Sequence, residues 1–282
     1  MRTPLLIRRC GSERGSDPGY GDKVRWLAAV VVCGCGRFGF EGSSADAAPT
    51  CVPVGHDEDH DGIDDVCDLC PFLADPDQLD SDGDLLGDIC DPNPMVAGER
   101  LVKFDSFWPT PDPAWRFEGA APMLGADAIS VDARGSSFYA VLDLVPSSDI
   151  FLFGGSVAAG TGGAAGEHQV AIMLRGTAPS TCFCELYSVS GVAKFGLTYT
   201  PDAAQFFVID STPAQRTIEN GDLSMTLAYQ PDLIRCETTW PASRATLSGP
   251  PPPGFGAPTA IALRVFGLVG RLDWFAQIHV GP

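Results

Sequence analysis

The sequence predicts a mainly β protein, in which an antiparallel β-sandwich follows a small irregular segment rich in acids and cysteines. Short β-rich runs alternate with turn residues over residues 100–282, and convincing helical periodicity is absent. Short strands with turn residues roughly every 8–12 positions are typical of an antiparallel sandwich or barrel. The 32 glycines, 24 prolines and 10 cysteines favour a loop-rich, strand-rich protein of an oxidising compartment.

We expect twelve strands in this domain, each a β-favouring run bounded by turn residues. They are Leu101–Phe107, Ala128–Asp132, Ser137–Leu144, Ile150–Phe153, Gln169–Leu174, Cys182–Val189, Phe195–Thr200, Gln205–Ile209, Ser224–Tyr229, Leu233–Thr239, Ala260–Phe266 and Gly270–His279. In Ser137–Leu144, apolar side chains fall on both faces of the strand. Such strands are buried between sheets and do not lie at an edge.

The acidity of the chain is concentrated in one place. The formal net charge is −18, and 14 acids lie between His56 and Asp91, where there is no Lys or Arg. The rest of the chain is therefore nearly neutral, and the acidity is a local feature. This pattern argues against nucleic acid as a partner, because binding phosphates requires clustered Lys and Arg.

The first 50 residues have the character of an export segment. Lys23 and Arg25 precede an apolar run over 26–32, in the charged-then-apolar order of a secretory signal. That run is too short to span a membrane, and no other apolar run approaches the required length of about 18 residues. We therefore expect an exported protein without a transmembrane span.

The end of this run resembles a bacterial lipoprotein signal, in which a small residue precedes a cysteine that is lipidated after cleavage. The residues are Val32-Cys33-Gly34-Cys35, and the resemblance implies Cys35 as a lipid anchor, with 1–35 as the signal segment. Plain secretion with cleavage nearby is the alternative. Residues 36–50, rich in Gly, Ser and Ala, are expected to form a flexible linker. The protein would then lie at the outer membrane or cell surface as a lipoprotein, or be secreted.

Acidic residues between 57 and 68 recur at the spacing of a calcium-binding loop. In such a loop positions 1, 3, 5, 9 and 12 carry carboxylates, position 6 is glycine and position 7 offers a backbone carbonyl. The carboxylates here are Asp57, Asp59, Asp61, Asp65 and Asp68, with Gly62 and Ile63 at positions 6 and 7. Alternate carboxylates converge on one side of a curled loop, so the sequence predicts a calcium site.

A second copy of the loop follows 23 residues later. Its carboxylates at the same five positions are Asp80, Asp82, Asp84, Asp88 and Asp91. Leu85 stands at position 6, so we expect the second loop to be strained or weaker, with Gly83 and Gly87 relieving the backbone. A merely solvated acidic run has no register, whereas these two loops share one.

Prolines interrupt the surroundings of both loops, which argues against the paired helices of an EF-hand. The segment resembles thrombospondin type 3 repeats instead. The resemblance rests on Asp57-x-Asp59-x-Asp61-Gly62-x-x-Asp65-x-x-Asp68-x-Cys70-Pro71, Asp75-Pro76-Asp77-Gln78, Asp80-Ser81-Asp82-Gly83-Asp84 and Gly87-Asp88-Ile89-Cys90-Asp91. It implies that residues 51–94 wrap around a row of calcium ions with little apolar core.

The same resemblance implies two disulfides. Cys67 stands where the family's repeat-ending cysteine stands, and Cys70 where the next unit begins, so we predict the pairs Cys51–Cys67 and Cys70–Cys90. A zinc site at Cys67 and Cys70 would need a second pair at suitable spacing, and the chain has none. A segment this polar cannot bury enough apolar surface to fold alone, whereas disulfides and metal can replace a core.

His56 and His60 lie beside and within the first loop. We expect both to face solvent, because calcium prefers oxygen ligands. We also expect residues 51–94 and 100–282 to be separate modules. Asp61→Ala would then weaken the first site and leave the melting of the sandwich unchanged.

The order of elements in residues 100–282 resembles the concanavalin A-like or laminin-G-like jelly roll. The resemblance rests on Phe107-Trp108 near Trp115-Arg116-Phe117 at the start and on Leu272-Asp273-Trp274-Phe275-Ala276-Gln277-Ile278 in the last strand. That fold serves lectins, adhesion modules and glycanases, so it does not decide function. The glutamates that a glycanase would need on one strand face are scattered: Glu118, Glu167, Glu185, Glu219 and Glu237. We therefore expect no enzymatic activity.

Three cysteines lie within the predicted strands. Cys182 and Cys184 share one face of a strand and Cys236 lies in a later one. We favour Cys184 with Cys236 as a cross-strand disulfide, with Cys182 free or the alternative partner. Four tryptophans, Trp108, Trp115, Trp240 and Trp274, have side chains that can stack on sugar rings. The alternative is that they pack in the core of the sandwich and bind no ligand.

Three functional hypotheses follow. The first is an extracellular calcium-binding surface protein whose sandwich serves adhesion or surface recognition, with a glycan or a protein as partner. The second is a carbohydrate-binding, lectin-like protein. The third and least supported is a glycan-active hydrolase.

Overall fold

The computed structural model describes residues 51–282, apart from 146, 159–166, 177–178, 190–191, 203–204, 214–219, 241–242 and 282. The expected signal segment 1–35, the proposed anchor Cys35 and the linker 36–50 lie outside the described residues. Thr50–Pro282 form one compact unit. Its regular secondary structure, where the chain is described, consists of fifteen strands. No stretch of this part of the chain forms a helix long and apolar enough to cross a bilayer.

The strands form two antiparallel sheets. Sheet A has the order β13-β12-β11-β6-β15-β4-β3, with β1 also paired to β15. Its strands are β1 (Arg100–Asp105), β3 (Met123–Leu124), β4 (Ile129–Asp132), β6 (Asp149–Ala158), β11 (Gly221–Gln230), β12 (Leu233–Trp240), β13 (Ser243–Gly249) and β15 (Val269–His279). β15 is long enough to pair with β4 through its first half and with β1 through its second.

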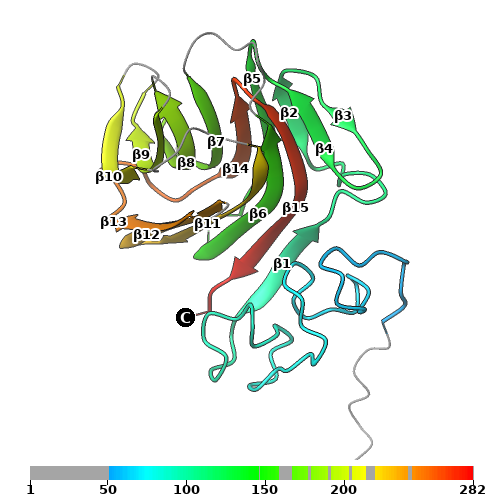
Figure 1. Ribbon diagram of the computed structural model, residues 1–282. Coiled ribbons are helices and arrows are strands. Elements are labelled where there is room, and N and C mark those ends of the chain that lie inside the picture. Colours follow the sequence, from blue (N-terminus) through cyan, green and yellow to red (C-terminus); the bar gives the residue numbers. More distant parts are fainter. Residues whose placement is uncertain are drawn as a thin grey trace, which may run out of the picture. The chain divides into compact units, whose positions relative to one another are not determined.

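Sheet B has the order β10-β9-β8-β7-β14-β5-β2. Its strands are β2 (Arg116–Gly119), β5 (Ser137–Asp143), β7 (His168–Arg175), β8 (Thr181–Val189), β9 (Val192–Thr200), β10 (Phe207–Pro213) and β14 (Ala260–Phe266). The two sheets lie face to face as two layers (Figure 1). The predicted antiparallel sandwich is confirmed.

One large hydrophobic core fills the space between the sheets. Sheet A contributes Phe151, Phe153 and Phe275, and sheet B contributes Phe138 and Leu174, all nearly or completely buried. Because side chains alternate along a strand, Tyr139 and Val141 point to the outer face of sheet B. That outer face carries a second apolar cluster, which explains why the strands of sheet B are apolar on both faces.

All twelve predicted strands overlap a strand of the structure, and three strands were missed. β2 and β3 are very short, and β13 has the sequence Ser-Arg-Ala-Thr-Leu-Ser-Gly, with few β-favouring side chains. All three lie at the ends of a sheet's strand order. Pairing with one neighbour, rather than intrinsic propensity, defines such edge strands.

A disulfide joins Cys184 of β8 to Cys236 of β12. The pairing is the one favoured from sequence, but it links sheet B to sheet A across the core instead of joining neighbouring strands. Cys182, two residues away on the same face, is a free thiol with no exposed surface. Burial raises the pKa of the Cys182 thiol to about 12.

Cys182 is therefore expected to resist alkylation in the folded protein. The thiolate is the reactive species, and near pH 8 a thiol with a pKa of about 12 is almost entirely protonated as well as covered. Labelling with iodoacetamide at pH 8, followed by peptide mass spectrometry, should find the Cys182 peptide unmodified in buffer and modified in denaturant. Rapid labelling in buffer would contradict the buried position.

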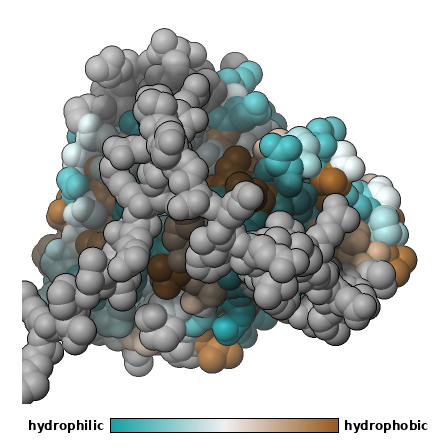
Figure 2. Space-filling view, turned by 90° about the horizontal axis from the view of Figure 1, so that it is seen from below, coloured by the Kyte–Doolittle hydropathy of each residue, from teal (hydrophilic) through white to brown (hydrophobic). Residues whose placement is uncertain are grey.

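Residues 51–94 form neither helix nor strand, and two disulfides, Cys51–Cys67 and Cys70–Cys90, connect them. Both pairings are those implied by the family resemblance. The segment, blue to cyan in Figure 1, exposes apolar residues such as Val66, Leu79 and Ile89. Because these apolar side chains are exposed, the segment has little apolar core of its own, as expected. Hydrophobic and hydrophilic residues are also mixed over the described surface of the molecule seen from below (Figure 2).

The apolar residues that the segment does bury pack against the sandwich. Phe72 and Leu86 are almost fully buried and share a cluster with Ala276 and Ile278 of β15. The ring of Phe72 also stacks on Trp274, with centroids 5.1 Å apart. This shared cluster argues against the independent melting that we expected for the two parts of the chain.

Candidate metal centre

In the first loop three carboxylates converge. One oxygen from each of Asp57, Asp59 and Asp61 lies within 4.8 Å of the others. Backbone amides hold the side chains in place: Gly62 N donates to Asp57 Oδ2 (3.0 Å) and Ile63 N donates to Asp61 Oδ1 (2.8 Å). Asp57 Oδ1 and Asp59 Oδ2 are buried and have no hydrogen-bond partner among the described residues.

The second loop repeats this arrangement. Asp80, Asp82 and Asp84 bring their oxygens within 4.8 Å of one another. Asp80 accepts hydrogen bonds from Gly83 N (2.7 Å) and Leu85 N (3.1 Å). Asp82 Oδ2 is buried and unpaired within the described chain. Because these contacts span five residues or fewer, the loop sequence alone can form them.

The aspartates at position 9 do not join these clusters. Asp65 Oδ1 accepts a hydrogen bond from Glu58 N (2.8 Å), and Asp88 Oδ1 accepts one from Ser81 N (2.7 Å). In both loops the carboxylate at position 9 therefore accepts a hydrogen bond from the backbone amide at position 2. The ligand role predicted for Ile63, through its carbonyl, is not tested by any contact and stays a prediction.

The aspartates at position 12 have different surroundings. Asp68 Oδ1 accepts hydrogen bonds from Cys70 N and the Gln78 side chain, both 2.7 Å long, and Asp68 joins no converging group among the described residues. Asp91 lies with Asp84 in a third group. Its Oδ2 is buried without a partner in the described part of the chain.

The third group contains a residue that the sequence reasoning missed. Glu99 is 5% exposed, and its ligand oxygen lies within 4.8 Å of those of Asp84 and Asp91. Asn93 Nδ2 donates to Glu99 Oε1 (2.7 Å), which holds the carboxylate inward. Glu99 follows the last loop position by eight residues, so the loop spacing contains no signal for it.

The converging carboxylates lack a compensating positive charge. Burial, with repulsion from neighbouring aspartates, raises the pKa of Asp59 to about 6. Burial and nearby carboxylates also raise the pKa of Asp82 and of Asp91. No Lys or Arg lies between residues 56 and 91. Buried, unpaired carboxylate oxygens without a cation are unfavourable, so the residues present fit a hard divalent ion.

Both loops use left-handed backbone at positions 4 and 6. In the first loop these are His60 (φ 63°) and Gly62 (φ 97°), and in the second they are Gly83 (φ 81°) and Leu85 (φ 74°). The two loops therefore have the same left-handed positions, but the glycine occupies position 6 in the first loop and position 4 in the second. The strain expected at Leu85 is present, because a left-handed conformation is costly for a leucine. Gly87 serves packing instead: an added Cβ would lie 2.7 Å from Cys70 Sγ.

Leu85→Gly is expected to stabilise the second loop by about 0.5–1 kcal/mol, after allowance for the extra freedom of glycine in the unfolded chain. The Leu85 side chain is 64% exposed, so little buried surface is lost. The urea midpoint should rise accordingly. Gly62→Ala is the matched control and should lower it, because Gly62 has the same left-handed conformation and open space around its Cβ position. A lower midpoint for Leu85→Gly would contradict the strain.

His56 does not face solvent, contrary to our expectation; its side chain is only 12% exposed. Its ring stacks on Trp108, with centroids 5.1 Å apart, its Nδ1 lies 2.7 Å from Asp65 Oδ2, and its Nε2 lies 2.7 Å from Asp127 Oδ1. Although burial lowers the pKa of His56, the hydrogen bonds to Asp65 and Asp127 raise it overall. Asp127 is 71 residues away in sequence, so this contact was invisible to local spacing. His60 is exposed, as expected.

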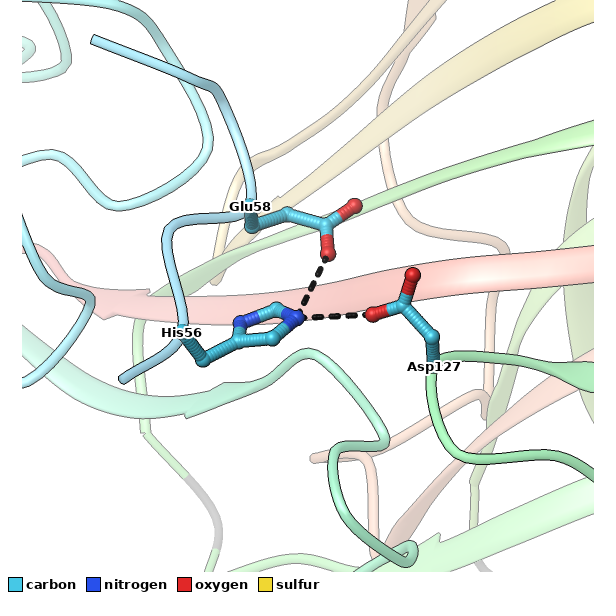
Figure 3. A group of neighbouring side chains, drawn as sticks. All are labelled: His56, Glu58 and Asp127. Carbon is cyan, nitrogen blue, oxygen red and sulfur yellow. Dashed lines mark hydrogen bonds and ion pairs between the residues drawn. The ribbon is translucent and has the colours of Figure 1, made fainter. Parts of the chain in front are cut away.

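Glu58 and Asp127 approach the same ring nitrogen of His56 (Figure 3). Burial, followed by the charges of Asp127 and Asp273, raises the pKa of Glu58 to about 8. The group borders a hollow of about 580 Å³ that Trp108 and Arg271 also line. The contact between His56 and Asp127 connects the first loop to the sandwich through polar side chains. It adds to the apolar contact that Phe72 and Leu86 make with the sandwich.

The tryptophans proposed for sugar stacking have different positions. Trp115 belongs to the core, and its Nε1 donates to Asp105 Oδ2 (2.8 Å). Trp274 packs against Phe72. Trp108 borders the 580 Å³ hollow, and the side chain of Trp240 lies outside the described part of the chain.

The glutamates of the sandwich form no catalytic pair where the structure describes them. Glu118 pairs with Arg175, and Glu237 pairs with Arg235 and Arg244. Glu185 is buried and accepts a hydrogen bond from Thr198 Oγ1 (2.6 Å). Glu167 is exposed, and Glu219 lies outside the described residues.

Comparisons with protein-family models and with curated proteins found no match. Among solved structures, the chain is similar to the CBM2 module of the evolved Dit of Lactobacillus casei phage J-1, with a TM-score of 0.50 and 10% identity over 66% of this chain and 97% of that one. It is also similar to the basic lectin of winged bean with Tn-antigen, with a TM-score of 0.50 and 7% identity over 65% of this chain and 99% of that one. At such identities the likeness shows the fold alone, a lectin-like jelly roll.

Proposed function

We propose that this protein is an exported, calcium-binding lectin whose sandwich recognises carbohydrate. One observation carries the calcium part: four buried carboxylate oxygens, on Asp57, Asp59, Asp82 and Asp91, lack partners among the described residues and lie among other acids. Carboxylate oxygens are ligands that calcium prefers, and each cluster brings three carboxylates together. Bound calcium supplies the positive charge that these clusters lack.

Residues 51–94 are proposed to be a pair of thrombospondin type 3 repeats. Support comes from the shared register of the two loops, their common left-handed positions, and the disulfides Cys51–Cys67 and Cys70–Cys90. In this proposal Glu99 extends the ligand set of the second loop beyond the repeat spacing. The lipid anchor at Cys35 belongs to the same proposal, and a Cys35→Ala variant should be released into the medium if it is correct.

Carbohydrate recognition is the proposed role of the sandwich. Its fold is that of winged bean lectin, although the fold by itself does not decide the ligand. The outer face of sheet B carries a mainly apolar hollow with aromatic walls and a few polar groups, and its lining includes Gln169, Tyr187 and Phe266. Aromatic faces with a few polar groups suit sugar rings.

Calcium binding is tested by calorimetric titration of the full chain with calcium. Saturation with dissociation constants of about 0.1–1 mM would support the proposal, in the range of extracellular modules. The double variant Asp59→Asn, Asp82→Asn should weaken binding, because it removes one central ligand charge from each loop. Absence of heat and of spectral change would refute calcium binding.

Carbohydrate binding is tested on a glycan array with the full chain in calcium. Reproducible binding to a defined glycan class supports the lectin. Silence across the array, together with attachment of the protein to cell surfaces, would refute it and favour adhesion through a protein partner. Release of reducing ends from polysaccharides would contradict a purely binding role.

A further inference from the structure

Arg264 lies near the centre of sheet B and forms no ion pair within 4 Å among the described residues. Its neighbours Leu263 and Val265 point into the core, so its own side chain points to the outer face of the sheet. Six of the other described arginines have a carboxylate partner within 4 Å: Arg116, Arg134, Arg175, Arg235, Arg244 and Arg271. Arg100 has none either, but its side chain is exposed to water. No such partner is found for Arg264 within the described ranges, and its Nε is buried without a hydrogen bond.

The direct contacts of the guanidinium group hold it in place, and none of those described is with a carboxylate. The charged carbon lies 5.4 Å from the ring centre of Tyr139 and 5.5 Å from that of Phe266. Nη2 reaches Ser137 Oγ at the long distance of 3.5 Å. A partly buried guanidinium that lacks an anion is costly, so a site of this kind is suited to an anionic group from outside the protein.

The strand register places a space beside Arg264. The residues in line across sheet B are Tyr139, Arg264, Ala171, Glu185 and Gly196, from β5 to β9. The small side chain of Ala171 separates the two charged residues. At Gly196 an added Cβ would lie 2.9 Å from the ring of Tyr187, so this ring lies over the sheet. The result is a hollow of about 420 Å³ bordered by Arg264, Tyr187 and Phe266.

The carboxylate in this row, that of Glu185, already has hydrogen-bond partners within the protein. Glu185 is 1% exposed, and its two oxygens accept hydrogen bonds from Thr198 Oγ1 and Gln169 Nε2. Burial raises the pKa of Glu185, while these two hydrogen bonds and the more distant charge of Arg264 act in the opposite direction. Glu167 lies at the rim and is exposed to water, which screens its charge. Among the described residues that line the hollow, Arg264 is the one Lys or Arg side chain that a ligand can meet.

We propose that this hollow binds a sugar that carries a carboxylate, a hexuronate residue of an acidic glycan. Arg264 pairs with the carboxylate, since a planar guanidinium matches a planar carboxylate better than it matches a hydroxyl group. The rings of Tyr187 and Phe266 face the apolar side of the sugar ring. The inference rests on the proposed carbohydrate binding and names its site and its ligand class. A neutral sugar would leave the guanidinium without an anion.

The test is calorimetry on the full chain in calcium with tetragalacturonate, its fully methylated ester and a neutral tetrasaccharide. We expect the acid to bind and the ester to bind about 10- to 100-fold more weakly, the range for losing a charged hydrogen-bonded pair. Arg264→Gln should cause a loss of the same size, and Arg264→Lys a smaller one. Arg235→Gln is the matched control on sheet A and should bind as the unmodified protein does.

Each outcome decides the proposal. Equal binding of acid and ester, or unchanged binding by a folded Arg264→Gln, overturns the acidic subsite and leaves carbohydrate recognition standing. Absence of binding both here and on the glycan array overturns both. If Arg264→Gln does not fold, Arg264→Lys and the ester comparison with the unmodified protein give the same decision.

Discussion

Chelation of calcium should lower the melting temperature of the protein by about 7–14 °C. Two sites with dissociation constants of about 0.1 mM each contribute about 1.8 kcal/mol at about 2 mM calcium, so their loss removes about 3.6 kcal/mol. For a unit of about 230 residues, each kcal/mol corresponds to about 2–4 °C. The effect reaches the sandwich because Phe72 and Leu86 pack against Ala276 and Ile278 of β15.

The measurement is a thermal melt followed by circular dichroism, in calcium and in excess EDTA. Magnesium is the control, since it demands a tighter octahedral site and should restore little of the stability. The variant Asp59→Asn, Asp82→Asn should show a much smaller difference between the two conditions. Identical melts with and without calcium would mean that the loops hold no ion that matters to the fold.

Removing the inter-sheet disulfide is the second large perturbation. The bond closes a loop of 52 residues between Cys184 and Cys236, and the chain-entropy relation assigns such a loop about 4 kcal/mol. The double variant Cys184→Ala, Cys236→Ala should therefore melt about 8–16 °C lower. Both positions are buried in the main core, so a small cavity adds to the loss.

Cys182→Ala is the matched control, because it removes a buried sulfur from the same face of β8 without cutting a link between the sheets. It should cost about 1 kcal/mol. If the double variant melted within a few degrees of this control, the disulfide would contribute little and the apolar core alone would hold the sheets together.

The positions of the sequence-predicted ligands show where local reasoning succeeds. Asp57, Asp59 and Asp61 converge because the amides of the same loop hold them, and nothing distant is needed. Asp65 and Asp88 carry the same spacing signal but bind the backbone at position 2 of their loops. Spacing predicts which carboxylates are near one another, while the direction of each oxygen depends on its hydrogen bonds.

Other parts of the candidate sites could not be read from local pattern. His56 meets Asp127 and Trp108 only because the first loop packs on the sandwich. Glu99 reaches Asp84 and Asp91 only because the chain returns to the second loop, where Gly98 N donates to Asp84 Oδ2. Neither residue has a neighbour in sequence that reveals its partner.

The sequence by itself determined the two acidic loops and the mainly β composition, because alternation, turn residues and loop spacing act over a few residues. The resemblance to the repeat also predicted the disulfides Cys51–Cys67 and Cys70–Cys90, and the positions of the cysteines in the predicted strands favoured Cys184–Cys236. The tertiary structure alone decided that the acidic segment shares a cluster with β15, that Cys184 and Cys236 cross between sheets, and that Arg264 stands beside a hollow. These features depend on strand order and register, which bring together residues separated by tens of positions, and no local preference encodes that pairing.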